Sequence, residues 1–135
     1  MTISKQKMMD LAFARSEGLR EFFEAYVECL IWSEGHGGGY SPANGHIPSP
    51  GVGAITLGGI REILSDCERF MREAGEMVVD DPSQAGHDFC LTRNGHGAGF
   101  DDGDWPENGK GLTDLCEKCG GQGLQMYRGK LYVHG

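Results

Sequence analysis

The sequence predicts an α+β fold in one domain, with helices in its N-terminal half and strands in its C-terminal half. Apolar residues recur with helical spacing over residues 4–34 and again over 55–78. After residue 86 the pattern becomes short and alternating, which is typical of strands. A length of 135 residues is usual for a single domain. We therefore expect an antiparallel helix pair packed on a small antiparallel sheet with one short helix.

Two segments carry the helical spacing. Residues 1–34 are expected to be helical from Ser4 onward, with a break left open near residues 16–18, where Ser16 is suited to cap a second helix. The second helix is expected over residues 55–78, mainly from about Thr56 to Gly75. Its apolar face includes Cys67, and its polar face, which includes Asp66, is expected to meet water.

Residues 35–54 connect the two helical segments. Seven glycines and three prolines in this stretch predict a loop without regular structure. Loops of this length are uncommon inside a compact domain and are usually functional or disordered.

The remaining residues, 86–135, are expected to form the β-rich part. Residues 87–93 alternate as a strand does, and Asn94-Gly95 is a strong signal for a hairpin turn. An acidic turn follows over residues 101–107, and a short helix is expected over about 112–119. The chain closes with a second predicted hairpin, 124–133, whose turn is Arg128-Gly129.

Composition limits the classes of function. The net charge is −8, from 20 acidic and 12 basic residues. Direct nucleic-acid binding is disfavoured because it requires clustered cations, so a partner with a basic surface is expected. We expect no membrane span, because no apolar run reaches 18 residues. The N-terminus lacks signal-peptide character, and five cysteines predict reduced thiols inside a cell.

Cysteine spacing suggests one candidate metal site. Cys116 and Cys119 form a Cys-x-x-Cys pair, and His87 and Cys90 have the same two-residue gap. Together the four side chains match the ligand set of a structural zinc ion. On a strand, however, His87 and Cys90 point to opposite faces, so zinc binding needs a bend there. Free thiols are the alternative.

The polar residues around the predicted hairpin form a second candidate site. His87, Asp88, Arg93, Asn94 and His96 supply groups for acid–base chemistry or for binding a small nucleotide. The stretch contains no nucleophile elbow and no His-Glu-x-x-His motif. Pairing of these side chains within the fold is the alternative reading.

The segment Gly86–Phe100 resembles a signature of short, uncharacterised phage and prophage proteins, which reads Gly-His-Asp-Phe-Trp-Leu-Thr-Arg-Asn-Gly-His-Gly-Ala-Gly-Phe-Trp-Asp. Within Gly86–Phe100 this chain differs only at Cys90, where the family has Trp; the next Trp is Asp101 here, and Asp102 matches the final Asp. Looser similarity extends to Cys29–Trp32, Asp66–Phe70 and Gly129–Tyr132. The resemblance implies a phage accessory gene acting in the host cytoplasm, and it transfers no activity.

An acidic phage protein of this size without a catalytic motif is expected to act by binding. We expect an inhibitor of a host defence system, of the anti-CRISPR or anti-restriction type, whose acidic surface occupies a basic site on a host protein or nucleoprotein complex. The expected contact residues are Asp101, Asp102, Asp104 and Glu107, with Asp80 and Asp81 nearby in the sequence. A small enzyme or nucleotide-binding protein and a zinc-stabilised module are the alternatives. The sequence assigns no oligomeric state.

Overall fold

The computed structural model describes residues 3–36, 39–41, 45–47, 51–96 and 99–135. Its helices are α1 (Lys5–Arg15), α2 (Leu19–Ser33), α3 (Leu57–Ala74), α4 (Pro82–Asn94) and α5 (Gly109–Glu117), with short 3-10 helices η1 (Val52–Ala54) and η2 (Gly75–Val78). Its strands are β1 (Gly39–Ser41), β2 (Gly45–Ile47), β3 (Gly123–Tyr127) and β4 (Lys130–His134). The α+β class is confirmed.

The N-terminal helical segment is broken where the sequence allowed a break. Ser4 caps α1 by accepting a hydrogen bond from the Lys7 amide, and Gly18 precedes α2 with a left-handed φ of 82°. A β-carbon at Gly18 would also lie 3.1 Å from the Pro82 ring. Glycine is therefore favoured at this bend by backbone conformation and by space.

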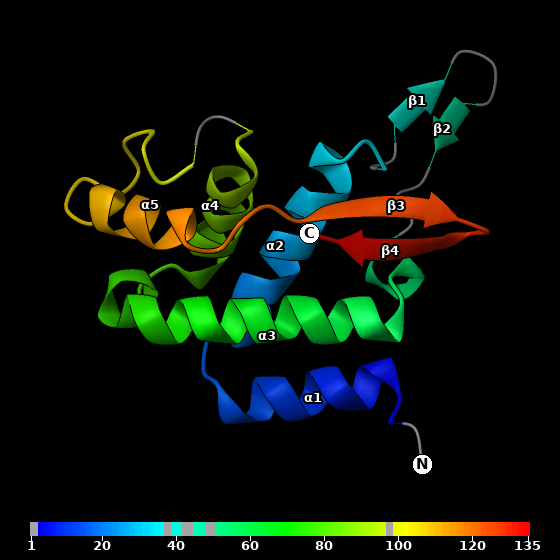
Figure 1. Cartoon of the computed structure of the whole chain (residues 1–135), viewed down its shortest axis with the longest axis horizontal. Helices are drawn as coiled ribbons and strands as arrows, with labels where there is room; N and C mark the ends of the chain where they lie inside the picture. Colours follow the sequence, from blue (N-terminus) through cyan, green and yellow to red (C-terminus); the bar gives the residue numbers. More distant parts are fainter. Residues whose placement is uncertain (1–2, 37–38, 42–44, 48–50, 97–98) are drawn as a thin grey trace.

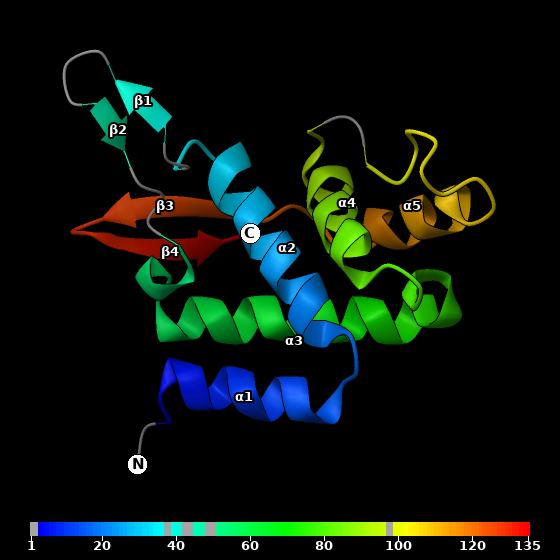
Figure 2. The same ribbon diagram turned by 180° about the vertical axis from the view of Figure 1, so that it is seen from behind.

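The break sets the arrangement of the helices. α1 and α3 lie side by side and run in the same direction, while α2 crosses α3 (Figures 1 and 2). α4 lies beside α2 and runs in the same direction as α2. This differs from the expected antiparallel pair, because the turn at residues 16–18 divides the N-terminal helical segment and redirects the chain across α3.

The second predicted helix is confirmed as α3. Thr56 caps it by accepting a hydrogen bond from the Gly59 amide, and the chain leaves the helix at Gly75. Its buried face carries the expected apolar residues, namely Ile60, Ile63, Leu64, Cys67 and Phe70.

The hairpin predicted over residues 86–100 is wrong, and the segment begins with the helix α4. Asp81 caps this helix by accepting from the Gln84 amide, and Pro82 occupies the first turn, where its missing N–H costs nothing. Gly95 ends the helix with a φ of 69°. A glycine with positive φ serves a hairpin turn and a helix C-terminus equally well, so Asn94-Gly95 did not distinguish them.

The prediction that residues 35–54 contain no regular structure is also wrong. β1 pairs with β2 in an antiparallel ladder, from Gly39 opposite Ile47 to Ser41 opposite Gly45. η1 follows before α3. The other parts of this stretch, 37–38, 42–44 and 48–50, lie outside the described residues.

The C-terminal hairpin is confirmed, and the short helix before it is α5. β3 and β4 pair from Gly123 opposite His134 to Tyr127 opposite Lys130. The two turn residues, Arg128 and Gly129, have φ values of 50° and 79°, which suit a two-residue hairpin turn. The Thr56 amide donates to the Leu131 carbonyl, which ties β4 to the start of α3.

Aromatic residues fill the space between α2, α3 and α4. Phe70 stacks on Phe89 with ring centroids 4.2 Å apart and on Phe100 at 5.8 Å, and Phe22 lies 5.6 Å from Phe89. All four are at most 1% exposed. None of the described helices is both long enough and apolar enough to cross a lipid bilayer.

The contact between α2 and α4 depends on Gly86. A β-carbon there would overlap the backbone carbonyl of Phe22, and backbone cannot move aside as a side chain can. We expect Gly86→Ala to lower the free energy of unfolding by about 1–3 kcal/mol, the usual cost of overpacking, measured by urea denaturation.

The matched control is Gly111→Ala in α5. A β-carbon at Gly111 has its closest contact at 3.5 Å, to the Met77 sulfur. Alanine in a helix is favoured over glycine by about 1 kcal/mol, so this variant should be neutral or more stable. If both variants lost the same free energy of unfolding, the close contact with Phe22 would not be the cause of the loss in Gly86→Ala.

Candidate functional site

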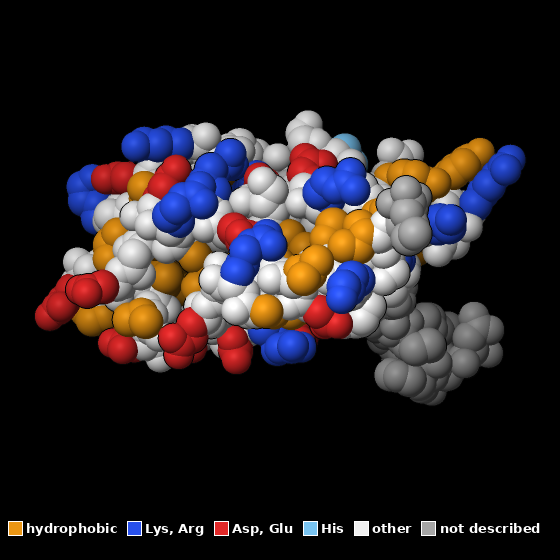
Figure 3. All heavy atoms as spheres, turned by 90° about the horizontal axis from the view of Figure 1, so that it is seen from below, with side chains coloured by type: hydrophobic (Ala, Val, Ile, Leu, Met, Phe, Trp, Pro, Cys, Tyr) orange, Lys and Arg blue, Asp and Glu red, His pale blue; other side chains and the backbone are white. Residues whose placement is uncertain are grey.

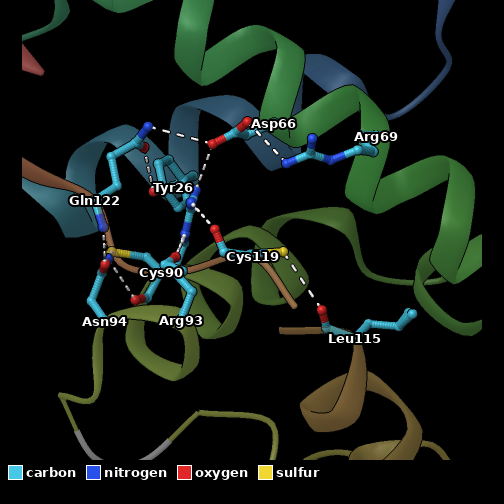
Figure 4. A network of polar contacts seen from close by, with 10 residues as sticks. Tyr26, Asp66, Arg69, Cys90, Arg93, Asn94, Leu115, Cys119 and Gln122 are labelled. Atoms are coloured by element: carbon cyan, nitrogen blue, oxygen red, sulfur yellow. Dashed lines mark hydrogen bonds and ion pairs between the residues drawn. The ribbon is translucent and has the colours of Figure 1, made fainter. Parts of the chain in front are cut away.

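The most concentrated polar cluster surrounds Arg93, which projects from α4 into the interior (Figure 4). Its side chain is only 3% exposed. The guanidinium donates to the Asp66 carboxylate at 3.0 Å and to the Tyr26 hydroxyl at 3.2 Å. It also donates to the backbone carbonyls of Cys119 at 3.3 Å and Gly120 at 2.9 Å. Arg93 thereby joins α2, α3, α4 and the segment that leads into β3.

Gln122 completes the cluster from the C-terminal segment and is itself buried. Its side-chain oxygen accepts from the Tyr26 hydroxyl at 2.6 Å, and its backbone amide donates to the Asn94 side chain at 2.6 Å. Asn94 in turn donates to the Cys90 carbonyl at 3.0 Å. Burial raises the pKa of the Tyr26 hydroxyl well above its ordinary value, with the Arg93 charge acting against this rise.

A second cluster is centred on Asp88, whose carboxylate is 1% exposed. It accepts hydrogen bonds from the Trp105 indole at 2.7 Å and from the Gln84 amide at 3.0 Å. The His87 ring lies 3.2 Å from the same carboxylate and is half exposed. Asp88 therefore fixes the segment that carries Trp105 against α4.

The acidic residues 101–107 lie between α4 and α5. Asp101, Asp102, Asp104 and Glu107 are all exposed. Asp101 accepts a hydrogen bond from the Thr113 hydroxyl at 2.9 Å. The charge of Asp102 raises the pKa of the Asp104 carboxyl. Of the two acids that precede α4, Asp80 is exposed and Asp81 serves as the cap of that helix.

The four candidate zinc ligands are not brought together. Cys90 and Cys116 are buried, whereas His87 is turned toward Asp88 and solvent. The Cys90 sulfur instead accepts a hydrogen bond from the Asn94 side chain at 3.8 Å, and the Cys119 thiol donates to the Leu115 carbonyl at 3.5 Å. Across the described part of the chain, no group of three or more His, Cys, Asp or Glu residues is placed to hold a metal ion.

The proposed acid–base residues are separated as well. Arg93 and Asn94 face the interior, while His87 lies beside Asp88. His96 lies past the end of α4, with its Nε2 atom 3.7 Å from the Glu34 carboxylate. These side chains do not converge on one cavity.

The other residues of the signature have structural roles. Thr92 accepts a hydrogen bond from the Phe100 amide at 3.0 Å, and a β-carbon at Gly99 would overlap the Thr92 hydroxyl. Gly86 permits the close helix contact, and Phe89 and Phe100 belong to the core. The described residues of Gly86–Phe100 therefore serve mainly packing and internal hydrogen bonding, and His87 and His96 are the exposed polar side chains among them.

Comparison of the chain with protein-family models, with curated proteins and with solved structures gives no significant match.

Sequence reasoning missed three partners in these clusters. Asp66 was expected to face water, but its side chain is 15% exposed and pairs with Arg93. Tyr26 and Gln122 gave no signal, because their contact joins positions 96 residues apart.

Removing the buried cation tests the first cluster. Arg93→Met leaves Asp66, the Tyr26 hydroxyl and two carbonyls without their donor, so the free energy of unfolding should fall by about 3–5 kcal/mol. Lys110→Met, which breaks the exposed pair with Asp114, should change it by less than about 1 kcal/mol. If Arg93 and Asp66 act as a pair, the double variant Arg93→Met/Asp66→Asn should lose less free energy of unfolding than the two single variants lose together.

Alkaline pH provides a further test. Burial raises the pKa of the Cys67 thiol well above its ordinary value of 9.0, and that of Cys116 to about 12. The unfolded chain therefore releases these protons at a lower pH than the folded chain does. Stability should accordingly be undiminished below pH 9 and should fall as the pH rises above it.

Urea midpoints measured across this pH range check the expectation. Cys67→Ala should make the fall in stability above pH 9 less steep. Ile63→Ala should not, because it truncates a buried side chain of the same helix that carries no titratable proton. An unchanged slope in Cys67→Ala would contradict the assignment.

Proposed function

We propose that the protein acts by binding, and that the acidic segment 101–107 is the surface that contacts its partner. The observation that carries this proposal is the way the segment is held. Asp101, Asp102 and Asp104 stand between two anchors, Phe100 in the core and the half-buried Trp105 on the Asp88 carboxylate, and Glu107 follows directly.

Anchoring matters because binding costs conformational entropy. A loop that is already fixed loses less freedom when a partner binds, so more of the interaction energy appears as affinity. The anchors also hold Asp102 and Asp104 close enough for the charge of one to raise the pKa of the other. A cationic partner relieves this repulsion.

The partner that fits this surface is a protein groove rich in arginine and lysine. Such grooves bind nucleic-acid phosphates, and a row of carboxylates presents the same sign of charge. In this proposal the protein competes with nucleic acid for the groove. The resemblance of Gly86–Phe100 to a phage signature favours a host defence complex, of the CRISPR effector or restriction type, as the target.

The test neutralises the segment without altering its shape. Asp101→Asn, Asp102→Asn, Asp104→Asn and Glu107→Gln are combined in one variant, and capture of basic host proteins from lysate is compared with the original protein. We expect the captured complex to bind the variant at least roughly tenfold more weakly, since several charge pairs are lost. The original protein should also displace labelled nucleic acid from that complex.

A matched control neutralises four exposed acids elsewhere, Asp10, Glu24, Glu62 and Glu73. This variant has the same net charge as the first. It therefore distinguishes an effect of the 101–107 carboxylates from an effect of overall net charge. Binding that survives neutralisation of 101–107, or that both variants lose equally, would falsify the proposal.

A second variant tests the anchoring. Trp105→Phe removes the hydrogen bond to Asp88 and keeps every charge of the segment. It should weaken binding but leave the salt dependence of binding unchanged. The variant keeps all the carboxylates, so the same number of counterions is released when the partner binds.

A further inference from the structure

Two adjacent hollows lie beside α3. The first, of about 380 Å³, lies between α1 and α3. The second, of about 610 Å³, lies between α3, the α1–α2 turn and the η2–α4 connection. Glu68 and Arg72 line both hollows, so the two are neighbours along α3. We refer to the two hollows together as the α3 groove.

Apolar and charged side chains both line the α3 groove, and two of the apolar ones are well exposed. Met71 of α3 is half-buried and lines the second hollow, whereas Leu64 lines the first and is only 4% exposed. Leu11 of α1 is 47% exposed in the first hollow, and Val79 is 63% exposed in the second. Hydrophobic side chains appear between the charged groups on the face seen from the α1 side (Figure 3).

The two ends of the groove differ in charge. Arg15, Arg61, Arg69 and Arg72 line the first hollow, against one acid, Glu68. Glu68 pairs with Arg15 at 2.6 Å, and Asp66 pairs with Arg69 at 3.2 Å. Among the described residues, Arg61 and Arg72 have no acidic partner within ion-pair distance. The second hollow adds Glu17 and Glu21, so the groove runs from a basic end to an acidic end.

The length of the groove suits a helix. From Arg61 to Gly75 the helix α3 rises about 21 Å at 1.5 Å per residue. A partner helix of about 14 residues covers the same distance and presents one apolar stripe along it.

We infer that the α3 groove is a docking site for an amphipathic helix of a partner protein. The apolar stripe of that helix lies on Leu11, Met71 and Val79, its acidic end lies at Arg61, and its basic end lies at Glu17 and Glu21. Helix-in-groove binding places apolar anchors at three- and four-residue spacing, and complementary charges fix the direction in which the helix lies. This site is separate from the acidic segment 101–107.

The probe is a synthetic, fluorescein-labelled helical peptide of about 14 residues. It carries leucine at i, i+3, i+4 and i+7, glutamate in one half and lysine in the other. Fluorescence anisotropy should show saturable binding, and a peptide of the same composition with scrambled leucines should not bind. Neutralising residues 101–107 should leave this binding unchanged, which keeps the two sites distinguishable.

Two exposed positions locate the binding on the protein. Leu11→Glu and Val79→Glu should each weaken binding roughly tenfold, which corresponds to about 1.4 kcal/mol. Tyr132→Glu on β4 is the matched control, because Tyr132 is 44% exposed and lies outside the groove. All three positions are exposed, so the variants should fold, as circular dichroism verifies.

A nitroxide on the glutamate end of the peptide tests its direction. It should broaden the NMR signals of residues near Leu11 and Arg61 and spare those near Val79. Absence of binding overturns the inference, as does binding that survives both Leu11→Glu and Val79→Glu. Broadening confined to Val79 overturns the assigned polarity.

Discussion

A charged guanidinium in the interior needs hydrogen-bond acceptors, and Arg93 obtains four of them from three other parts of the chain. Asp66 supplies the opposite charge from α3, Tyr26 supplies a hydroxyl from α2, and the Cys119 and Gly120 carbonyls come from the segment before β3. Because an unpaired buried charge is far more costly than a paired one, these elements are held in one relative position. The core aromatics pack around that arrangement, and no buried side-chain nitrogen or oxygen of the described residues lacks a partner.

The sequence predicted some elements well for identifiable reasons. α3 is amphipathic, with one face in the core, so its spacing was clear. α4 buries Ala85, Gly86, Asp88, Phe89, Cys90 and Leu91, so its apolar residues do not follow helical spacing, and residues 87–93 alternate as those of a strand do. The site was harder to predict, because Asp66 lies on the polar side of α3 and meets its partner only through tertiary packing. The clustered charges of 101–107 were visible in the sequence, but their anchors at Phe100 and Trp105 were not.

The same fold separates its charges in space. Carboxylates dominate the segment between α4 and α5, whereas arginines gather where α1 meets α3. The net charge of −8 is a property of the whole chain and does not indicate the local charge of either region. Local fields within about a Debye length, roughly 8–10 Å, decide what each surface attracts. A single acidic protein can therefore present two surfaces that select partners of different charge.

The contact between Tyr26 and Gln122 has a consequence for biosynthesis. Its two residues are 96 positions apart, so the first helices leave the ribosome long before the glutamine has been made. Until then Arg93 lacks the carbonyls of residues 119 and 120, and the interior cannot close around a half-satisfied cation. Such long-range closure is intrinsically slow. The nascent chain thus completes this cluster only after residues 119–122 have emerged, and a chain truncated before them lacks the partners that close its core.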